Sequence, residues 1–296
     1  MAGPRLRAFR TRAVVRVLLV LAAIGRRIPL RVGRAFGRAL GTLAWHVVRR
    51  ERHKALRNIA IAFPGWTAEQ RERAIRAMFH HLGMSLFEVL WLPNFNPRRR
   101  EATTVVEGLE PVLELMDEGR TVMAFTGHCG NWEWLATTVA SYGRPLAAMQ
   151  RERDEPEMNE LITRIRASSG IQTIDRGSSG AGRDIIQALR RPGMIAFLID
   201  QNIRAESAKV PFFGRPALTP IGPGKLAVRM EVTCVSMFIE RKADGTQHVR
   251  VNEPFAVTRD DDPLDVTARI TREIEDQVRR VPEQWVWMHD RWRERR

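Results

Sequence analysis

The sequence lacks several features that would assign it to a familiar class of protein. It has two cysteines, Cys129 and Cys234, and neither belongs to a group with the spacing of metal ligands. We therefore expect no disulfide framework, no metal site and a reducing compartment, with both cysteines serving as small core or site-lining residues. The sequence also has no Gly-x-Ser-x-Gly segment, so it does not offer the nucleophile elbow of an α/β-hydrolase.

Acidic residues are almost missing from the N-terminal arm, Met1–Asn58. The arm holds fifteen Lys and Arg but a single acid, Glu51, whereas the whole chain has 48 Lys and Arg against 34 Asp and Glu. Subtraction leaves 33 residues of each sign for the rest of the chain, so the net charge of +14 belongs entirely to the arm. A basic arm with an apolar stripe and a neutral body behind it favours an anionic membrane surface. We expect no nucleic-acid partner, because such binding draws on a basic body.

A long apolar run is missing as well. Val17–Ile24 is apolar, but Arg16 precedes it and Arg26 follows it closely. A helix that spans a bilayer needs about 20 apolar residues. We therefore predict that this segment is an uncleaved anchor or a helix that lies on the membrane.

A helical pattern follows this segment. Thr67 begins a capping box with Gln70, which predicts the start of a further long helix. We divide the chain into basic amphipathic, membrane-associating helices over residues 1–58 and a body over residues 59–296. Within the first part, apolar residues recur at helical spacing, and glycines at every fourth position let either another helix or lipid approach closely. The apolar residues are Val32, Phe36, Leu40, Leu43 and Val47, and the glycines are Gly33, Gly37 and Gly41.

Beyond Thr103 the pattern alternates between short apolar runs and amphipathic stretches. This alternation predicts an α/β fold with a mostly parallel central sheet flanked by helices. The pair Asp244-Gly245 predicts a turn between the last two strands. The expected strands are Thr121–Thr126, Leu146–Met149, Met194–Ile199, Thr233–Ile239 and His248–Val251, and the expected helices are Glu157–Ala167, Ala181–Leu189 and Pro263–Arg280.

The segment Gly127–Trp134 (GHCGNWEW) carries the most specific chemical signal. It directly follows an apolar strand, and open α/β sheets bind ligands at the carboxyl ends of their strands. Asn131 is expected to cap a helix, which places Glu133 in the first helical turn and His128 in the preceding loop. Across a tight turn, Glu133 can accept the proton of one imidazole nitrogen and leave the other as a base. The alternative is a pair of side chains that only satisfy the turn.

A strand followed by His-x4-Glu resembles the glycerolipid acyltransferase superfamily. The wider pattern is similar to the lipid A late acyltransferases, which are lauroyl and myristoyl transferases of the Kdo-lipid A type, and to related phosphatidylinositol mannoside acyltransferases. Gln150 and Glu155 depart from this pattern, since the lipid A enzymes usually have an aromatic residue and Asn there. The likeness is carried, in family order, by ALRNIAIAFPG (55–65), GHCGNWEW (127–134), RIRASSG (164–170), LIDQN (198–202), VPFFGRPA (210–217) and PEQWVWMHDRW (282–292).

The resemblance implies acyl transfer from a thioester, carried by acyl carrier protein or coenzyme A, to a hydroxyl of a membrane glycolipid. The first choice of acceptor is a lipid A precursor. His128 would be the general base and Glu133 would orient it, without any cofactor. The residues implied in substrate binding are Asn131, Arg151, Arg166, Asp200, Phe213 and Arg215.

Each implied binding residue also has an ordinary structural interpretation. Arg166 is a candidate for a charged role near the acceptor or the thioester, but it also fits a solvated helix face. Asp200 follows an apolar strand and is a candidate for orienting Arg166 or a catalytic loop, or for capping a turn. Phe213 and Arg215 are candidates for gating an acyl groove or entering the membrane interface, and a packed loop is the alternative.

Other functions stay open on the sequence alone. The acceptor is alternatively a lysophospholipid or a phosphatidylinositol mannoside, and a thioester hydrolase that uses His128 on water is a further alternative. The resemblance implies a location at the cytoplasmic face of the bacterial inner membrane, peripheral or N-terminally anchored. Membrane lipids, acyl carrier protein and a glycolipid acceptor are the implied partners.

Overall fold

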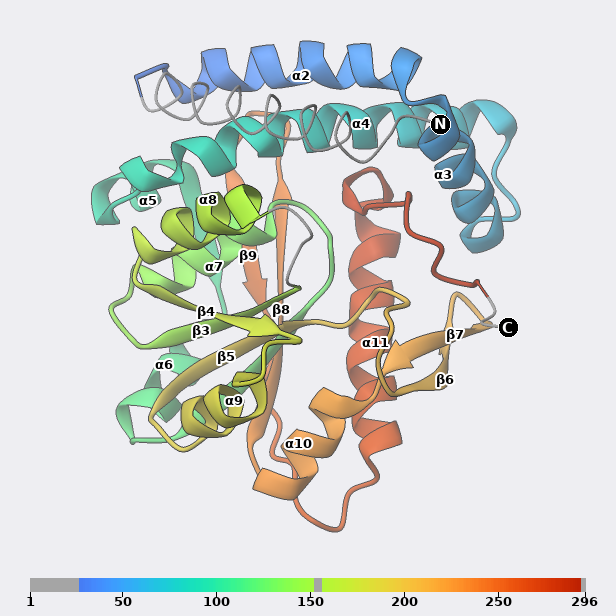
Figure 1. Ribbon diagram of the computed structural model, residues 1–296. Coiled ribbons are helices and arrows are strands. Elements are labelled where there is room, and N and C mark those ends of the chain that lie inside the picture. The colour runs from blue at the N-terminus through green and yellow to red at the C-terminus, as the bar shows by residue number, and fades with distance from the viewer. Residues whose placement is uncertain (1–26, 152–155, 294–296) are drawn as a thin grey trace.

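A seven-stranded sheet forms the centre of the computed structural model, which describes residues 27–151 and 156–293 (Figure 1). Its strand order is β1-β9-β8-β2-β5-β3-β4. Every neighbouring pair is parallel except β8 and β9, so the predicted mostly parallel α/β sheet is confirmed. The strands are β1 (Thr104–Glu107), β2 (Thr121–Thr126), β3 (Leu146–Arg151), β4 (Ile171–Arg176), β5 (Gly193–Leu198), β8 (Thr233–Arg241) and β9 (Gln247–Val251).

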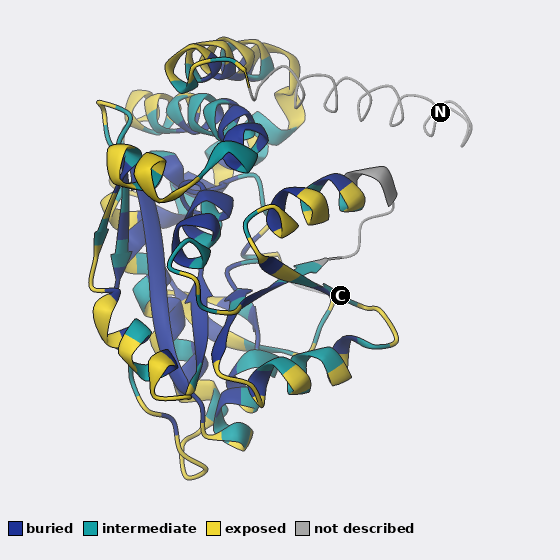
Figure 2. Cartoon of the chain, turned by 90° about the vertical axis from the view of Figure 1, so that its left-hand side faces the viewer, coloured by how far each residue is buried: buried dark blue, intermediate teal, exposed yellow. Residues whose placement is uncertain are grey.

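The central strands are buried on both faces (Figure 2). β2 has the bounds predicted from its apolar run, and β8 is buried along its whole length. Such continuous burial is typical of parallel strands covered by helices on both sides. The predicted turn at Asp244-Gly245 joins β8 to the antiparallel β9, and Gly245 adopts a positive φ of 90° there.

Helices cover the two faces of the sheet and bury two apolar clusters. The predicted bounds of α9 and α11 are confirmed, and α8 begins one residue earlier than predicted. The sheet and these helices place the carboxyl ends of β2, β3 and β5 at one edge. One face carries α6 (Glu110–Asp117), α7 (Trp132–Ala140) and α8 (Pro156–Ala167), and the other carries α9 (Ala181–Leu189), α10 (Gly222–Met230) and α11 (Pro263–Arg280).

Three long helices lie across one end of the sheet: α2 (Leu30–Val47), α3 (Arg49–Ala62) and α4 (Ala68–Trp91) (Figure 1). The predicted capping box at Thr67 begins α4. α2 and α4 pack closely because glycines meet across their contact: a Cβ atom added to Gly37 would lie 2.4 Å from the carbonyl oxygen of Gly83. The glycines of α2 therefore face a helix, which decides between the two partners left open by the sequence.

A second side of α2, next to the glycine side, is apolar and exposed. We call its five residues the α2 stripe; their exposed fractions lie between 38 and 69 %. Val17–Ile24 lies outside the described residues. Within the described part of the chain, no helix has the length and apolar character needed to cross a bilayer. The α2 stripe consists of Val32, Phe36, Leu40, Leu43 and Val47.

The remaining segments connect these layers. A two-stranded antiparallel hairpin, β6 (Ser207–Phe212) and β7 (Arg215–Pro220), packs against α11. Trp285 and Trp287 are fully buried in the core and follow the short helix η2 (Pro282–Gln284). The short elements η1 (Leu92–Asn94) and α5 (Pro97–Thr103) lead from α4 into β1.

Candidate active site

His128 lies in the loop between β2 and α7, at the carboxyl edge of the sheet. Asn131 ends this loop as the N-cap of α7, with its side chain accepting a hydrogen bond from the backbone N–H of Trp134. The imidazole Nδ1 of His128 lies 2.7 Å from Oδ1 of Asp200, and the His128 backbone N–H donates to Oδ2 of the same carboxylate at 2.7 Å. Asp200 thus fixes both the backbone and the ring of His128.

Asp200 is suited to this role because it is buried and charged. The Trp285 indole N–H also donates to its Oδ2, at 2.7 Å. Burial by itself would raise the pKa of Asp200, but the neighbouring His128 ring and the hydrogen bonds from His128 and Trp285 hold that pKa well below its usual range. A carboxylate bonded to Nδ1 keeps a proton on that nitrogen and leaves Nε2 as the basic atom. Within residues 27–151 and 156–293, Nε2 of His128 has no hydrogen-bond partner.

Glu133 does not make the predicted hydrogen bond to the His128 ring. Both of its oxygens accept hydrogen bonds from the guanidinium of Arg166 on α8, at 2.7 and 2.9 Å. Burial alone would lower the pKa of Arg166, but the charge and hydrogen bonds of Glu133 raise it above its ordinary value. The contact expected between His128 and Glu133 is therefore corrected: the His128 ring contacts Asp200 instead. The physical reason is that β5 lies beside β2, so the residue that follows β5 reaches the His128 loop directly.

A cavity of about 870 Å³ opens beside His128 at this edge of the sheet. Its volume falls within the range of small-molecule sites. Glu133 and Arg166 lie in its wall, and Gln150 joins them through a 3.4 Å contact to Arg166. The cavity therefore brings together the expected base and the expected Glu and Arg. Trp132, Gln150, Gln201 and His289, which sequence reasoning had not assigned to the site, line it as well.

His289 is a second titratable neighbour of the His128 ring, after Asp200. Its ring centroid lies 5.4 Å from that of His128, and its Nε2 contacts the side-chain amide of Gln201 at 2.6 Å. Burial first, and the neighbouring His128 second, lower the pKa of His289 to about 4. His289 is therefore neutral at pH 7 and acts as a hydrogen-bonding group in the wall of the cavity.

The loop that carries His128 is held by the C-terminal segment of the chain. The N–H of Gly130 donates to the carbonyl of Gln284 at 2.8 Å, and the N–H of Val286 donates to the carbonyl of His128 at 3.1 Å. Gly130 adopts a φ of 63°, and a Cβ there would lie 2.2 Å from the carbonyl oxygen of Ile239. Because the N–H groups of His128 and Gly130 are already engaged, neither is free to stabilise an oxyanion.

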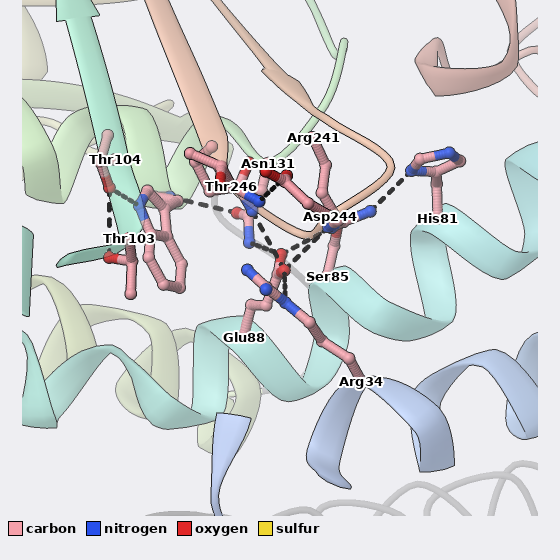
Figure 3. A network of polar contacts seen from close by, with 12 residues as sticks. Arg34, His81, Ser85, Glu88, Thr103, Thr104, Asn131, Arg241, Asp244 and Thr246 are labelled. Carbon is pink, nitrogen blue, oxygen red and sulfur yellow. Dashed lines mark hydrogen bonds and ion pairs between the residues drawn. The ribbon is translucent and has the colours of Figure 1, made fainter. Parts of the chain in front are cut away.

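A buried polar network supports the same loop from α4 (Figure 3). The carboxylate of Glu88 accepts hydrogen bonds from Arg34 on α2 at 2.6 Å and from Arg241 on β8 at 2.6 and 2.8 Å. It also accepts from the amide of Asn131 at 2.9 Å. Although burial opposes it, the two arginines and Asn131 lower the pKa of Glu88. The network therefore joins the N-terminal helices to the end of the His128 loop.

Of the six expected binding residues, Arg166 lines the cavity, whereas Asn131, Asp200, Phe213 and Arg215 do not. Phe213 is buried at the tip of the β6–β7 hairpin, where its ring packs against Trp287 with centroids 6.3 Å apart, so the packed-loop alternative holds for it. Arg215 is exposed at the start of β7. The backbone of Arg151 ends β3, but its side chain lies outside the described residues, as does Glu155.

Replacing Cys129 by alanine is expected to leave turnover within about threefold of the unaltered protein. The Cys129 thiol is buried beside Asp200, and burial first and that carboxylate second raise its pKa far above its ordinary value. A thiol held in its neutral form is a poor nucleophile, although it neighbours the base in sequence. Steady-state turnover of Cys129→Ala measures this directly. Loss of activity on brief treatment with iodoacetamide, or a large loss in Cys129→Ala, would point instead to a covalent cysteine mechanism.

Sequence comparison decides the family. The sequence profile described as bacterial lipid A biosynthesis acyltransferase matches residues 4–294. This chain belongs to that family. The predicted relationship to the lipid A late acyltransferases is therefore confirmed, and so is its class as an acyltransferase.

Individual relatives of the family align over most of the chain. The lipid A biosynthesis palmitoleoyltransferase of Escherichia coli K12 is 28% identical over 271 residues, which is 91% of this chain and 87% of the relative. The lipid A biosynthesis lauroyltransferase of the same strain is 27% identical over 276 residues, with 91% and 88% covered. A phosphatidylinositol mannoside acyltransferase of Mycobacterium tuberculosis is 29% identical over 157 residues, covering 48% and 46%.

Proposed function

We propose that this protein transfers a fatty acyl group from an acyl thioester to a hydroxyl of a lipid A precursor, with His128 as the general base. The observation that carries the mechanism is the 2.7 Å contact between His128 Nδ1 and the buried carboxylate of Asp200, beside a cavity of about 870 Å³. An imidazole held in this way is poised to accept a proton at Nε2. A hydroxyl needs such a base because it is a weak nucleophile while it keeps its proton.

The proposed reaction is a single acyl transfer. Nε2 of His128 takes the acceptor's hydroxyl proton as the oxygen attacks the thioester carbonyl, and a carbon–oxygen bond forms. The tetrahedral intermediate then collapses, the carbon–sulfur bond breaks, and the imidazolium returns the proton to the leaving thiolate. Asp200 stabilises the imidazolium between these steps. The donor we propose is acyl carrier protein or coenzyme A carrying the acyl chain.

A lipid A precursor is the acceptor we favour, because the relatives aligned over nine tenths of the chain carry that activity in their names. A phosphatidylinositol mannoside is the second candidate. It is favoured by the Mycobacterium tuberculosis relative and by Gln150, which departs from the lipid A pattern and contacts both Arg166 and Asp175 inside the site.

The test of the proposed function is a transfer assay with the purified full chain. Acyl carrier protein and coenzyme A thioesters are each combined with a lipid A precursor, a phosphatidylinositol mannoside or a lysophospholipid, and the products are read by mass spectrometry. We expect one added acyl group on the lipid A precursor. Release of free fatty acid alone, at the same rate with and without every acceptor, would identify a thioester hydrolase and overturn the proposal.

We propose peripheral attachment to the cytoplasmic face of the inner membrane, with the α2 stripe against the lipid. Support comes from an exposed apolar stripe on a helix that also exposes cations, which is the composition of helices that lie in an anionic interface. The whole stripe is exposed, while the glycine side of α2 is closed by α4. The exposed basic residues on α2 and near its two ends are Arg27, Arg31, Arg38, Arg49 and Arg50.

Replacing Phe36 and Leu43 together by glutamate is expected to weaken binding to vesicles at least about tenfold. Burying one large apolar side chain contributes about 1.5–3 kcal/mol, and a factor of ten corresponds to about 1.4 kcal/mol. Co-sedimentation with vesicles that contain phosphatidylglycerol measures the change. The matched control is Val105→Glu with Leu264→Glu, since both of these apolar residues are exposed elsewhere on the protein. Equal sedimentation of the two double variants would exclude the α2 stripe as the contact.

A further inference from the structure

The cavity beside His128 has two chemically different sides, because the edge of the sheet divides it. Successive residues of a strand point to opposite faces. On β5 and just beyond it, Phe197 and Ile199 join the apolar cluster beneath α9, α10 and α11. Leu198 lies between them and instead borders Glu133 and Arg166 on the face covered by α7 and α8. We call the first side the apolar lobe and the second the polar lobe.

The polar lobe is built around fixed charges. The buried ion pair of Glu133 and Arg166 forms its wall, and Gln150 connects Arg166 to Asp175 through a 2.6 Å hydrogen bond. A hydrocarbon chain placed here would cover these polar groups without offering them a hydrogen bond, which is unfavourable. The polar lobe therefore suits a hydroxyl-bearing head group.

The apolar lobe has the opposite character. Met149 and Phe197 line it from the sheet, and Ile185 of α9 and Leu226 of α10 line it from the helices. Lys225, beside Leu226, forms an exposed ion pair with Glu206 at the rim of the cavity. Ile185 and Leu226 are half-buried, so part of each side chain is available to a ligand. Ile185 and Leu226 come from helices on the same face of the sheet and pack against the same apolar cluster as Phe197. The part of the cavity that these residues line is the apolar lobe.

A second void lies beneath α7, and its size excludes it as an acyl site. It is lined by small residues that include Ala136 and Ala148, and its volume is about 40 Å³. A single water molecule already takes a share of about 30 Å³ in the liquid. The main cavity is some twenty times larger than this void and is the space that can hold a fatty chain.

We infer that the apolar lobe holds the acyl chain of the donor, and that Ile185 and Leu226 set the chain length that the protein accepts. The inference rests on the proposed acyl transfer and adds the direction in which the donor lies. With the chain against α9 and α10, the thioester carbonyl reaches His128 from the apolar lobe, and the acceptor hydroxyl reaches it from the polar lobe. Filling the apolar lobe therefore excludes long chains, and enlarging it admits longer ones.

The experiment is a competition among acyl thioesters of 8 to 18 carbons, with the product distribution read by mass spectrometry. Ile185→Trp and Leu226→Trp are each expected to lower the ratio of long-chain to short-chain product at least about tenfold, since one methylene in an apolar pocket changes specificity about 10- to 200-fold. Ile185→Ala with Leu226→Ala is expected to shift the distribution toward longer chains. The alanine variant tests the same two residues without adding bulk. It therefore still tests the inference if the tryptophan variants do not fold.

Controls on the same helices show whether a shift in product chain length comes from the apolar lobe or from any added side-chain bulk. Gln187→Trp on α9 and Arg229→Trp on α10 add an indole at exposed positions and are expected to keep the original distribution. Ala136→Leu, in the void beneath α7, is also expected to keep the original distribution of product chain lengths. An unchanged distribution in every Ile185 and Leu226 variant with turnover retained, or a shift caused by Ala136→Leu alone, overturns the lobe assignment. Absence of any acylated product from the unaltered protein overturns the proposed function itself, so the two failures are distinguishable.

Discussion

Replacing His128 by alanine is expected to lower kcat about 10²–10⁴-fold while the protein still folds and binds vesicles. The expected loss is that of a general base, because Nε2 is the atom that takes the acceptor's proton and the methyl group of alanine cannot. KM for the donor is expected to change little, since His128 contacts the reacting atoms and not the chain that binds in the cavity. Steady-state kinetics with one thioester and one acceptor measure both quantities. Turnover within a factor of three of the unaltered protein would remove His128 from the mechanism.

Two conservative variants test which carboxylate orients the base. Asp200→Asn retains an oxygen for the backbone N–H of His128 and the Trp285 indole, but it turns an amide N–H toward Nδ1. The imidazole must then accept at Nδ1 and carry its proton on Nε2, which is the wrong tautomer for a base. We expect kcat to fall about 10²–10⁴-fold, as for His128→Ala.

Glu133→Gln is the matched comparison, because Glu133 lines the same cavity but is bonded to Arg166. The glutamine oxygen can still accept one of the two guanidinium hydrogen bonds. We expect kcat to fall less than about tenfold, with the main change in KM for the acceptor. The reverse order of effects, with Glu133→Gln disabling the enzyme and Asp200→Asn sparing it, would return the orienting role to Glu133.

Glu88→Ala is expected to destabilise the fold by about 3–5 kcal/mol, the cost of removing one partner of a buried ion pair. The change leaves the guanidinium groups of Arg34 and Arg241 without their shared carboxylate, and Arg241 is 6 % exposed. Because domains are stable by only about 5–15 kcal/mol, this is a large fraction of the total. The midpoint of urea unfolding measures the loss, provided that the slope is unchanged. Loss of the hydrogen bond to Asn131 should lower turnover of the folded fraction as well.

The control for Glu88 is an exposed ion pair. Asp117 forms a two-bond pair with Arg144 at the surface, and Asp117→Ala is expected to leave the unfolding midpoint unchanged within error, because exposed pairs contribute little. Glu88→Gln keeps a hydrogen-bond acceptor and the shape of the side chain but not its charge. Its unfolding midpoint is expected to lie between those of Glu88→Ala and Asp117→Ala. A Glu88→Ala variant as stable as Asp117→Ala would show that the network does not support the fold.

The local sequence pattern predicted those helices and strands in which the spacing of apolar residues fits one type of secondary structure from end to end. The apolar run 121–126 is buried on both faces and was predicted to the residue, as was the amphipathic helix Pro263–Arg280. The β6–β7 hairpin was missed because Pro211 and Pro216 face each other in its register, and proline ordinarily argues against a strand. β4 was missed because four of its six residues are polar, as suits an edge strand with little to bury.

The sequence placed His128 at the edge of the sheet but did not identify the carboxylate that its ring contacts. Glu133 is five residues from His128, whereas Asp200 is 72 residues away and becomes a neighbour only because β5 pairs with β2. Strand order is a tertiary property that periodicity does not encode. A signal for Asp200 did exist, since an aspartate directly after a fully apolar strand lies at the edge where parallel strands place their functional residues. This signal identified Asp200 and gave the catalytic loop as one of two possible partners, but it did not identify the His128 ring as the group that Asp200 contacts.

The glycine contact between α2 and α4 has a consequence for how the acceptor meets the base, given the proposed attachment to the membrane. At this contact the backbone of one helix packs directly against the backbone of the other, because the glycines have no side chains. The two helices are also joined by the Arg34–Glu88 ion pair, which would break if they slid apart. α4 also contributes Leu82 to the cavity wall, so the helix that packs against α2 also borders the cavity. The proposed membrane contact on α2 and the cavity are therefore parts of one rigid unit. With the stripe against the lipid, the acceptor has to bring its hydroxyl to the cavity, because the protein does not move the two surfaces toward each other.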